Sequence, residues 1–245
     1  LMVVMIRVWL FGAFVVWLAL RRAGSLRKAA ATKQPGLQIL RGLLLAGEIC
    51  VMVLAFVQLG LVDTHAVFIC YPLIVAALSG PLLGERVGWR RWGAIAVGLA
   101  GVLVVLQPGL GVFEPGAILP LLAATMFALY ALLTRYAART DSAATSFFWA
   151  GVTGALAMTA VGIWFWEPMA PRDWGWMAAL CVSGAFGHWL LIKCYEVAEA
   201  SAVQPFAYLQ LVWASLIGVT IFGETVTMPV VIGAALVIAA GLFTL

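Results

Sequence analysis

The stretch LLGERVGWRRWGAIAVGLAG, residues 82–101, contains the pattern that decides the fold. One apolar run ends at Gly84-Glu85, a short connection rich in arginine follows, and a second apolar run begins at Trp92. The same alternation continues along all 245 residues, of which 65% are hydrophobic and only 10% are charged. Because about a quarter of the residues of a soluble domain are charged, this composition excludes a soluble fold.

The apolar runs have the length of membrane-spanning helices, since about 20 apolar residues cross the hydrocarbon core as an α-helix. The strands of a membrane barrel would instead show short segments of alternating polarity. We therefore predict an all-α polytopic membrane protein. Its nine visible helices are expected at residues 1–20, 38–59, 66–84, 92–107, 116–136, 145–166, 174–195, 203–222 and 229–245.

Basic residues gather in alternate connections, which predicts the orientation of the chain because cytoplasmic connections carry an excess of Lys and Arg. The connections expected in the cytoplasm contain or adjoin Arg21, Arg22, Arg27, Lys28, Lys33, Arg41, Arg86, Arg90, Arg91, Arg135 and Arg139. Those around Asp63, Glu114, Glu167 to Asp173 and Glu224 then face the opposite side, and the C-terminus faces the cytoplasm. The net charge of +4 is explained by this topology signal, and no nucleic-acid partner is expected.

The quoted stretch has a counterpart, IFGETVTMPVVIGAALVIAAG, at residues 221–241, where Gly223-Glu224 matches Gly84-Glu85. The two Gly-Glu pairs are predicted on opposite sides of the membrane, so the halves are inverted, as in many carriers. An inverted duplication needs an odd number of helices per half, here five. We therefore expect two repeats, residues 1–110 and 111–245, and a tenth helix preceding Leu1 that the first repeat lacks.

Two longer stretches carry a family resemblance. They are LGLVDTHAVFICYPLIVAALSGPLLGERVGWRRWGAIAVGLAGVLVV at 59–105 and GAFGHWLLIKCYEVAEASAVQPFAYLQLVWASLIGVTIFGE at 184–224. The pattern resembles the drug/metabolite transporter superfamily, in particular its ten-helix EamA-type carriers. This resemblance implies a secondary carrier or exporter of small polar metabolites, working by alternating access in the inner membrane without ATP or a cofactor. The partners expected are the substrate, the lipid bilayer and possible coupling protons, with a monomer or homodimer as the assembly.

Charged residues inside predicted spans are costly and therefore candidates for function. Arg7 and Glu48 lie on adjacent antiparallel helices at depths that differ by roughly 5 Å, at about 1.5 Å of rise per residue, so an Arg side chain can bridge them. They form either a structural ion pair or a substrate contact, and Glu48 is alternatively a proton or cation site. His188 aligns with Glu48 in the repeat and either faces a shared cavity or bonds a carbonyl, whereas Lys193 is expected to reach the cytoplasmic surface.

Aromatic residues with a polar tip offer a lining for a partly apolar substrate. Tyr71 and Tyr208 are favoured because Pro72 and Pro205 nearby free backbone carbonyls inside a span. The complete predicted substrate site comprises Arg7, Glu48, Tyr71, Tyr130, Trp149, His188, Tyr208, Gln210 and Trp213.

Three further features are interpreted as structural. Glu85 and Glu224 are expected to stop one helix and to complement the dipole of the next. The small-residue rows Gly93, Val97, Gly101 and Gly233, Val237, Gly241 are expected to let helices approach closely. The four cysteines are widely spaced, so neither a metal site nor a redox motif is predicted.

The predicted function is transport of amino acids, because a lining of aromatic rings, one acid and one or two bases suits a zwitterion with an apolar side chain. The alternative is a proton-coupled multidrug or cation antiporter that uses Glu48. An enzyme is not expected, since His65 and His188 are far apart and neither a nucleophile with a base nor ligands at metal spacing accompany them.

Overall fold

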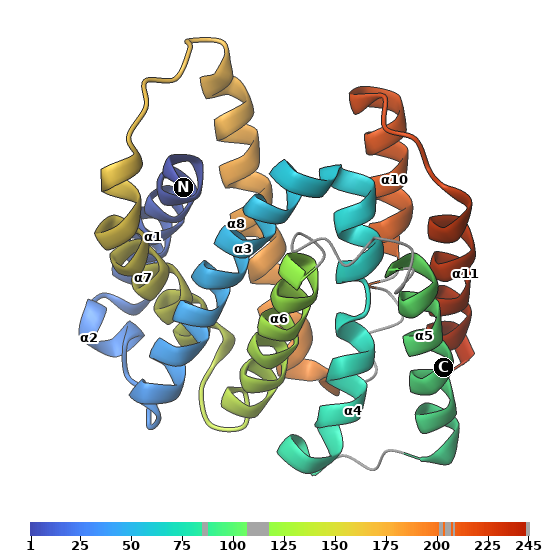
Figure 1. Ribbon diagram of the computed structural model, residues 1–245. Helices are drawn as coiled ribbons and strands as arrows, with labels where there is room; N and C mark the ends of the chain where they lie inside the picture. Colours follow the sequence, from blue (N-terminus) through green and yellow to red (C-terminus); the bar gives the residue numbers. More distant parts are fainter. Residues whose placement is uncertain (85–87, 107–117, 201–202, 204–206, 208, 244–245) are drawn as a thin grey trace. The chain divides into compact units, whose positions relative to one another are not determined.

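The computed structural model describes residues 1–245 except 85–87, 107–117, 201–202, 204–206, 208 and 244–245 (Figure 1). The described residues form helices joined by short connections, which confirms the all-α class. Five helical segments are long and apolar enough to span a membrane: Met2–Arg21, Pro35–Phe68, Ile118–Ala137, Ala143–Phe165 and Asp173–Val197. Shorter apolar helices occupy Tyr71–Leu83, Trp92–Gly101, Leu209–Phe222 and Met228–Ala240.

The chain divides into two compact units, each built from two separate parts of the sequence. Unit 1 comprises Leu1–Cys50 and Leu133–Val197, and unit 2 comprises Val51–Leu132 and Ala198–Leu245. Unit 1 contains α1 (Met2–Ala23), α2 (Leu26–Ala29), the start of α3 (Pro35–Phe68), the end of α6 (Ile118–Ala137), α7 (Ala143–Gly162), the 3-10 turn η2 (Ile163–Phe165) and α8 (Asp173–Val197). Unit 2 contains the remainder of α3 and α6 with α4 (Tyr71–Leu83), α5 (Trp89–Leu106), α10 (Leu209–Phe222) and α11 (Met228–Phe243).

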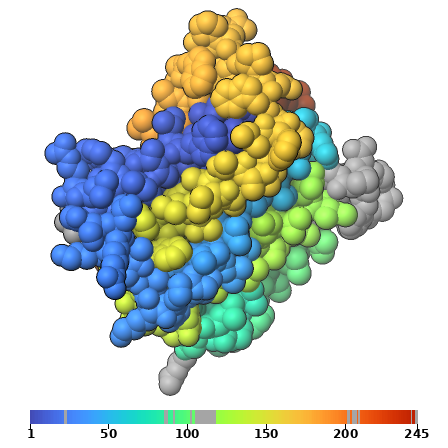
Figure 2. Space-filling view, turned by 90° about the vertical axis from the view of Figure 1, so that its left-hand side faces the viewer, coloured from blue at the N-terminus to red at the C-terminus, as the bar shows by residue number. Residues whose placement is uncertain are grey.

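In unit 1, α1 and α7 pack side by side and antiparallel. Met5 near the start of α1 faces Gly162 at the end of α7, whereas Val15 faces Gly151 in the first half of α7. The missing side chains let the two backbones approach, which is how helices associate where lipid supplies no hydrophobic drive. Figure 2 shows the atoms of α7 lying between those of α1 and the start of α3.

In unit 2, α5 and α11 meet where residues of the two predicted small-residue rows face each other. A Cβ atom on Gly101 would lie 2.7 Å from the carbonyl oxygen of Gly233 and 3.0 Å from Cγ2 of Val237. The predicted close approach is thus confirmed at these residues, and it occurs within the chain. Gly93, at the other end of the α5 row, has open space around it.

The connection predicted between residues 59 and 66 is much shorter than expected. Helical hydrogen bonding continues through α3 to Phe68, and a single residue, Gly60, with φ 78° and ψ −178°, breaks the helix into two segments. Glycine takes this positive φ without the steric penalty of a side chain. The predicted 66–84 helix is itself interrupted at Ile69 and Cys70. In a continuous helix the ring of Pro72 would clash with the backbone carbonyl of Phe68, four residues earlier.

The role expected for Glu224 is wrong in one respect. Gly223 ends α10 with φ 67°, as a helix-stopping glycine should. The Glu224 carboxylate, however, accepts hydrogen bonds from the backbone N–H groups of Leu61 (2.7 Å) and Val62 (2.8 Å). It therefore caps the second segment of α3 and not the start of α11, because the break at Gly60 exposes unpaired donors there. Glu85, its sequence counterpart, lies outside the described residues.

Candidate functional site

Three of the predicted site residues come together inside unit 1. Arg7 of α1, Glu48 of α3 and His188 of α8 are drawn from three separate helices. Arg7 interacts electrostatically with both Glu48 and His188. Glu48 is buried, with 6% of its surface exposed, and the described residues place neither a hydrogen bond nor an ion pair within 4.0 Å on its carboxylate. The two opposite charges are thus neighbours without being locked in a direct salt bridge.

Gly184 gives the Arg7 side chain its position against α8. A Cβ atom on Gly184 would lie 2.8 Å from Nε and 2.9 Å from Nη2 of Arg7. The guanidinium therefore rests on the bare backbone of α8, one helical turn from His188. Any other residue at this position would push the guanidinium away from the site.

A small pocket adjoins these charges. Arg7 and His188 line it together with apolar and small residues of α1, α3, α7 and α8, among them Phe11 and Gly154. The ring of Phe11 stacks on His188 with 6.4 Å between the ring centroids. The cavity volume is about 10 Å³, which is about the space of one water molecule. A metabolite therefore requires the helices around this pocket to move apart.

The predicted lining residue Trp149 lies elsewhere in unit 1. It is on α7, and its indole N–H donates a hydrogen bond of 3.1 Å to the backbone carbonyl of Ala30. This contact holds the segment that follows α2 against the start of α7. Ala150, its neighbour, lines the pocket beside Arg7 instead.

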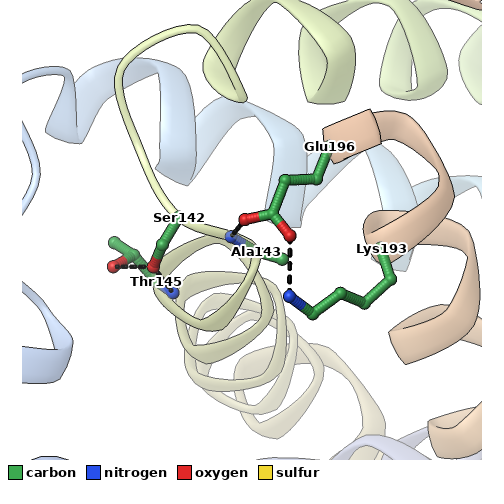
Figure 3. A network of polar contacts seen from close by, with 5 residues as sticks. All are labelled: Ser142, Ala143, Thr145, Lys193 and Glu196. Carbon is green, nitrogen blue, oxygen red and sulfur yellow. Dashed lines mark hydrogen bonds and ion pairs between the residues drawn. The ribbon is translucent and has the colours of Figure 1, made fainter. Parts of the chain in front are cut away.

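Lys193 lies near the end of α8 and is partly exposed, and its predicted place at the cytoplasmic surface stays a prediction. Its ammonium group lies 2.7 Å from Oε2 of Glu196, and its side chain is 47% exposed. The other oxygen of Glu196 accepts a hydrogen bond of 2.9 Å from the backbone N–H of Ala143 at the start of α7 (Figure 3). Ser142 caps the same helix through the backbone N–H of Thr145. This network joins α7 to α8 and lies apart from the Arg7 pocket.

Tyr71 and Tyr130 both belong to unit 2, where they form an aromatic cluster with Phe68 and Phe127. Tyr71 meets Phe127 edge to face at 4.8 Å between centroids, and Tyr130 lies 6.0 Å from the same ring. Both tyrosines are buried. The structure thus places them in the interior of unit 2, and their role in binding substrate stays a prediction.

The remaining predicted residues are on or before α10. Gln210 and Trp213 lie on its exposed face, and 62% of the Trp213 surface is exposed. Tyr208 lies outside the described residues. Their assignment to the substrate site therefore stays a prediction as well.

Sequence reasoning missed a buried polar network at the end of unit 1. Arg41, interpreted as a topology signal, is completely buried and donates hydrogen bonds of 3.0 and 2.9 Å to the hydroxyl of Thr134. It also donates to Oε1 of Gln38, whose amide nitrogen in turn donates to Asp141 at 2.7 Å. The signal available in the sequence was the pair Gln38 and Arg41, three residues apart and so on one helical face.

Within the described ranges, no group of three or more His, Cys, Asp or Glu residues is arranged to hold a metal ion. A guanidinium, a carboxylate and an imidazole on three helices can instead bind the oppositely charged ends of one small molecule.

Apolar helices of spanning length with charged side chains between them define a multi-pass helical membrane protein. Residues 114–245 match the model of the EamA-like transporter family, and the chain belongs to that family. It is a membrane transporter of small metabolites within the drug/metabolite transporter superfamily.

Several relatives are similar over most of the chain. An S-adenosylmethionine uptake transporter of Rickettsia prowazekii is 27% identical over 217 residues, which cover 89% of this chain and 74% of the relative. A riboflavin transporter of Vibrio cholerae is 28% identical over 234 residues, which cover 94% of this chain and 78% of the relative. A solved crystal structure with 18% identity superposes with a TM-score of 0.74 over 99% of this chain and 86% of its own, which shows the same fold.

Proposed function

We propose that this chain transports metabolites that carry an amino-acid head group, and that Arg7, Glu48 and His188 bind that head. The observation that carries the proposal is the meeting of Arg7 and Glu48 inside unit 1 without a direct salt bridge. The guanidinium suits the carboxylate of a zwitterion, and the Glu48 carboxylate suits its ammonium group. A substrate that inserts between them replaces their mutual attraction with two charge-assisted contacts.

The name of one of the two relatives supports this class of substrate. S-adenosylmethionine, which the Rickettsia prowazekii relative takes up, is a molecule with an amino-acid head. Riboflavin, named for the Vibrio cholerae relative, lacks such a head. Arg7 and Glu48 favour the first kind of molecule, because a neutral ring system inserted between them would separate two opposite charges without giving either a new charged partner.

The closed form of the pocket supports transport by alternating access. A cavity of about 10 Å³ holds no metabolite, so binding and release require α1, α3 and α8 to separate. The site opens to one side of the inner membrane and then to the other, as expected for a secondary carrier.

A second candidate is exchange of a cation for a proton at Glu48. The observation that favours it is the burial of this carboxylate, 6% exposed, with no hydrogen bond from the described residues. Such a group binds either a proton or a cationic substrate. Flux would then depend strongly on an imposed pH gradient.

The test is uptake by proteoliposomes that contain the full-length protein. Labelled amino acids and S-adenosylmethionine are supplied separately, each with and without a pH gradient. Saturable uptake of either without the gradient supports facilitated transport of amino-acid heads, and uptake only with the gradient supports proton coupling through Glu48. Uptake of neither under both conditions, by protein shown to be folded in the liposomes, contradicts the proposed head group.

A further inference from the structure

The pocket beside Arg7 has walls of unequal bulk. Helix α1 contributes the large side chains of Arg7, Val8 and Phe11. The lining residues from α7 are Ala150 and Gly154, which lie one helical turn apart on the same face. In the closed form, side chains of α1 therefore fill the space that the small residues of α7 leave open.

The glycines that line this pocket differ in what their missing side chain makes room for. A Cβ atom on Gly42 would lie 2.5 Å from Cβ of Thr153, so this glycine lets α3 pack against α7. Gly184 makes room for the guanidinium described above. A Cβ atom on Gly154 would instead meet Val8 of α1 at 3.8 and 3.9 Å, which are ordinary contact distances. An alanine would therefore fit at position 154 in the closed form.

Glycine at position 154 does not serve the stability of the helix. Gly154 is buried in the interior of α7. A glycine there costs stability relative to alanine, because the unfolded chain has more conformational freedom to lose. Since neither close packing nor the seat of the guanidinium requires this glycine, the substrate pocket that it lines gives the better explanation.

We propose that the hollow over Gly154 receives the side group of the substrate, and that Gly154 determines how large this group can be. The inference rests on the proposed function, in which Arg7 binds the carboxylate of an amino-acid head. Val8, the next residue of α1, fills the hollow in the closed form. When α1 moves away to admit a substrate, the guanidinium keeps the carboxylate and the vacated hollow takes the side group.

The surroundings of the hollow define the chemistry of this side group. Besides Val8 and Phe11, the pocket is lined by Leu45 and Ile49 of α3, which are apolar. A polar side group would lose its hydrogen bonds to water without gaining new ones there. Because the hollow holds the side chain of Val8 in the closed form, it accommodates a branched apolar group. Leucine therefore fits the complete site better than alanine, which leaves the hollow unfilled.

The experiment compares two substrates in proteoliposomes that contain the full-length protein. Labelled leucine and alanine are supplied separately at the same low concentration, and the initial rates of uptake are divided to give a leucine-to-alanine ratio. This ratio does not depend on how much folded protein each preparation contains. We expect the wild type to favour leucine.

Two substitutions reduce the hollow in steps. Gly154→Ala should lower the leucine-to-alanine ratio by about tenfold, the discrimination that one methyl group gives in an apolar pocket. Its melting temperature should equal or exceed that of the wild type, because alanine favours the helix. Gly154→Val should lower the ratio further.

Two further sets of variants serve as controls. Gly93→Ala and Gly93→Val place the same groups on an exposed part of α5 with open space around it, and they should leave the ratio unchanged. Arg7→Gln should lower the uptake of both amino acids alike, because both carry the same head group.

The outcomes separate the side-group hollow from the head-group site. A ratio within about twofold of the wild type in Gly154→Ala overturns the role of Gly154, whether or not Gly154→Val folds. If Arg7→Gln still lowers both uptakes, the head group stands and only the hollow is lost. A wild type that favours alanine, or that takes up neither amino acid, also overturns the inference, and the uptake test of the proposed function then decides the head group separately.

Discussion

At the scale of single residues, a missing methyl group sets the position of the Arg7 guanidinium. The guanidinium occupies the space where a Cβ atom of Gly184 would stand, 2.8 Å from Nε. Because a guanidinium is the far end of a flexible side chain, it can move aside at little cost. A substitution at Gly184 therefore disturbs the candidate site more than the fold.

Gly184→Ala should reduce substrate uptake by about tenfold, which corresponds to about 1.4 kcal/mol, because the displaced guanidinium no longer meets the carboxylate of the substrate. The melting temperature should stay close to that of the wild type. Gly187→Ala on the same helix is the matched control, since a Cβ atom there meets open space. Equal uptake by the two variants in proteoliposomes would contradict the position assigned to Arg7.

At the scale of helices, two contacts between residues far apart in the sequence join elements of unit 2. Glu224 caps the second segment of α3 at Leu61 and Val62. Its carboxylate fits there because Gly60 and Gly218 lack side chains, with Cβ positions 2.9 and 3.0 Å from the carboxylate oxygens. The α5 and α11 backbones meet at Gly101 and Gly233 in the same unit.

Glu224→Ala should lower the free energy of unfolding by about 1–3 kcal/mol, because two backbone N–H groups lose their acceptor. Glu224→Gln, which keeps one acceptor oxygen, should lose less. Thermal unfolding in detergent measures both, with Glu167→Ala, an exposed carboxylate in another connection, as the control. A Glu224→Ala protein as stable as Glu167→Ala would show that the cap contributes nothing.

Gly101→Ala should destabilise the protein by about 1–3 kcal/mol, because the new Cβ atom would lie 2.7 Å from a backbone oxygen of Gly233 that cannot rotate away. Gly93→Ala on the same helix has open space and should be neutral or slightly stabilising. The comparison of the two melting temperatures separates close packing from helix propensity. Equal melting temperatures for Gly101→Ala and Gly93→Ala would contradict a close backbone contact between α5 and α11 at Gly101.

At the scale of the whole molecule, the apolar runs predicted the all-helical membrane class, because helix length and hydropathy are local properties. The sequence also paired Arg7 with Glu48, since depth along antiparallel helices can be counted. It did not reveal the cap at Leu61, because Glu224 acts across more than 160 residues at a break that only the backbone shows. The buried network around Arg41 was not predicted either, since an arginine beside a connection can mark the cytoplasmic side and also bond buried partners.

The predicted topology can be tested over the whole chain by labelling single cysteines with a membrane-impermeant maleimide. Asp63→Cys should react from the outside of intact cells, because its connection lacks basic residues. Lys33→Cys should react only after the membrane is permeabilised; both native side chains are exposed. The opposite pattern of labelling would invert the orientation and place the C-terminus outside.

The most direct test of the central claim is substrate uptake by proteoliposomes that contain full-length wild type, Arg7→Gln, Glu48→Gln or the exposed-residue control Glu167→Gln. Each protein is first shown to be folded by its elution as a single species. The account predicts that both site variants lose about tenfold or more of the uptake, because each leaves one charged end of the substrate without its partner. The control should transport normally. Uptake within about twofold of wild type by both Arg7→Gln and Glu48→Gln, a change of under about 0.5 kcal/mol, would contradict the site.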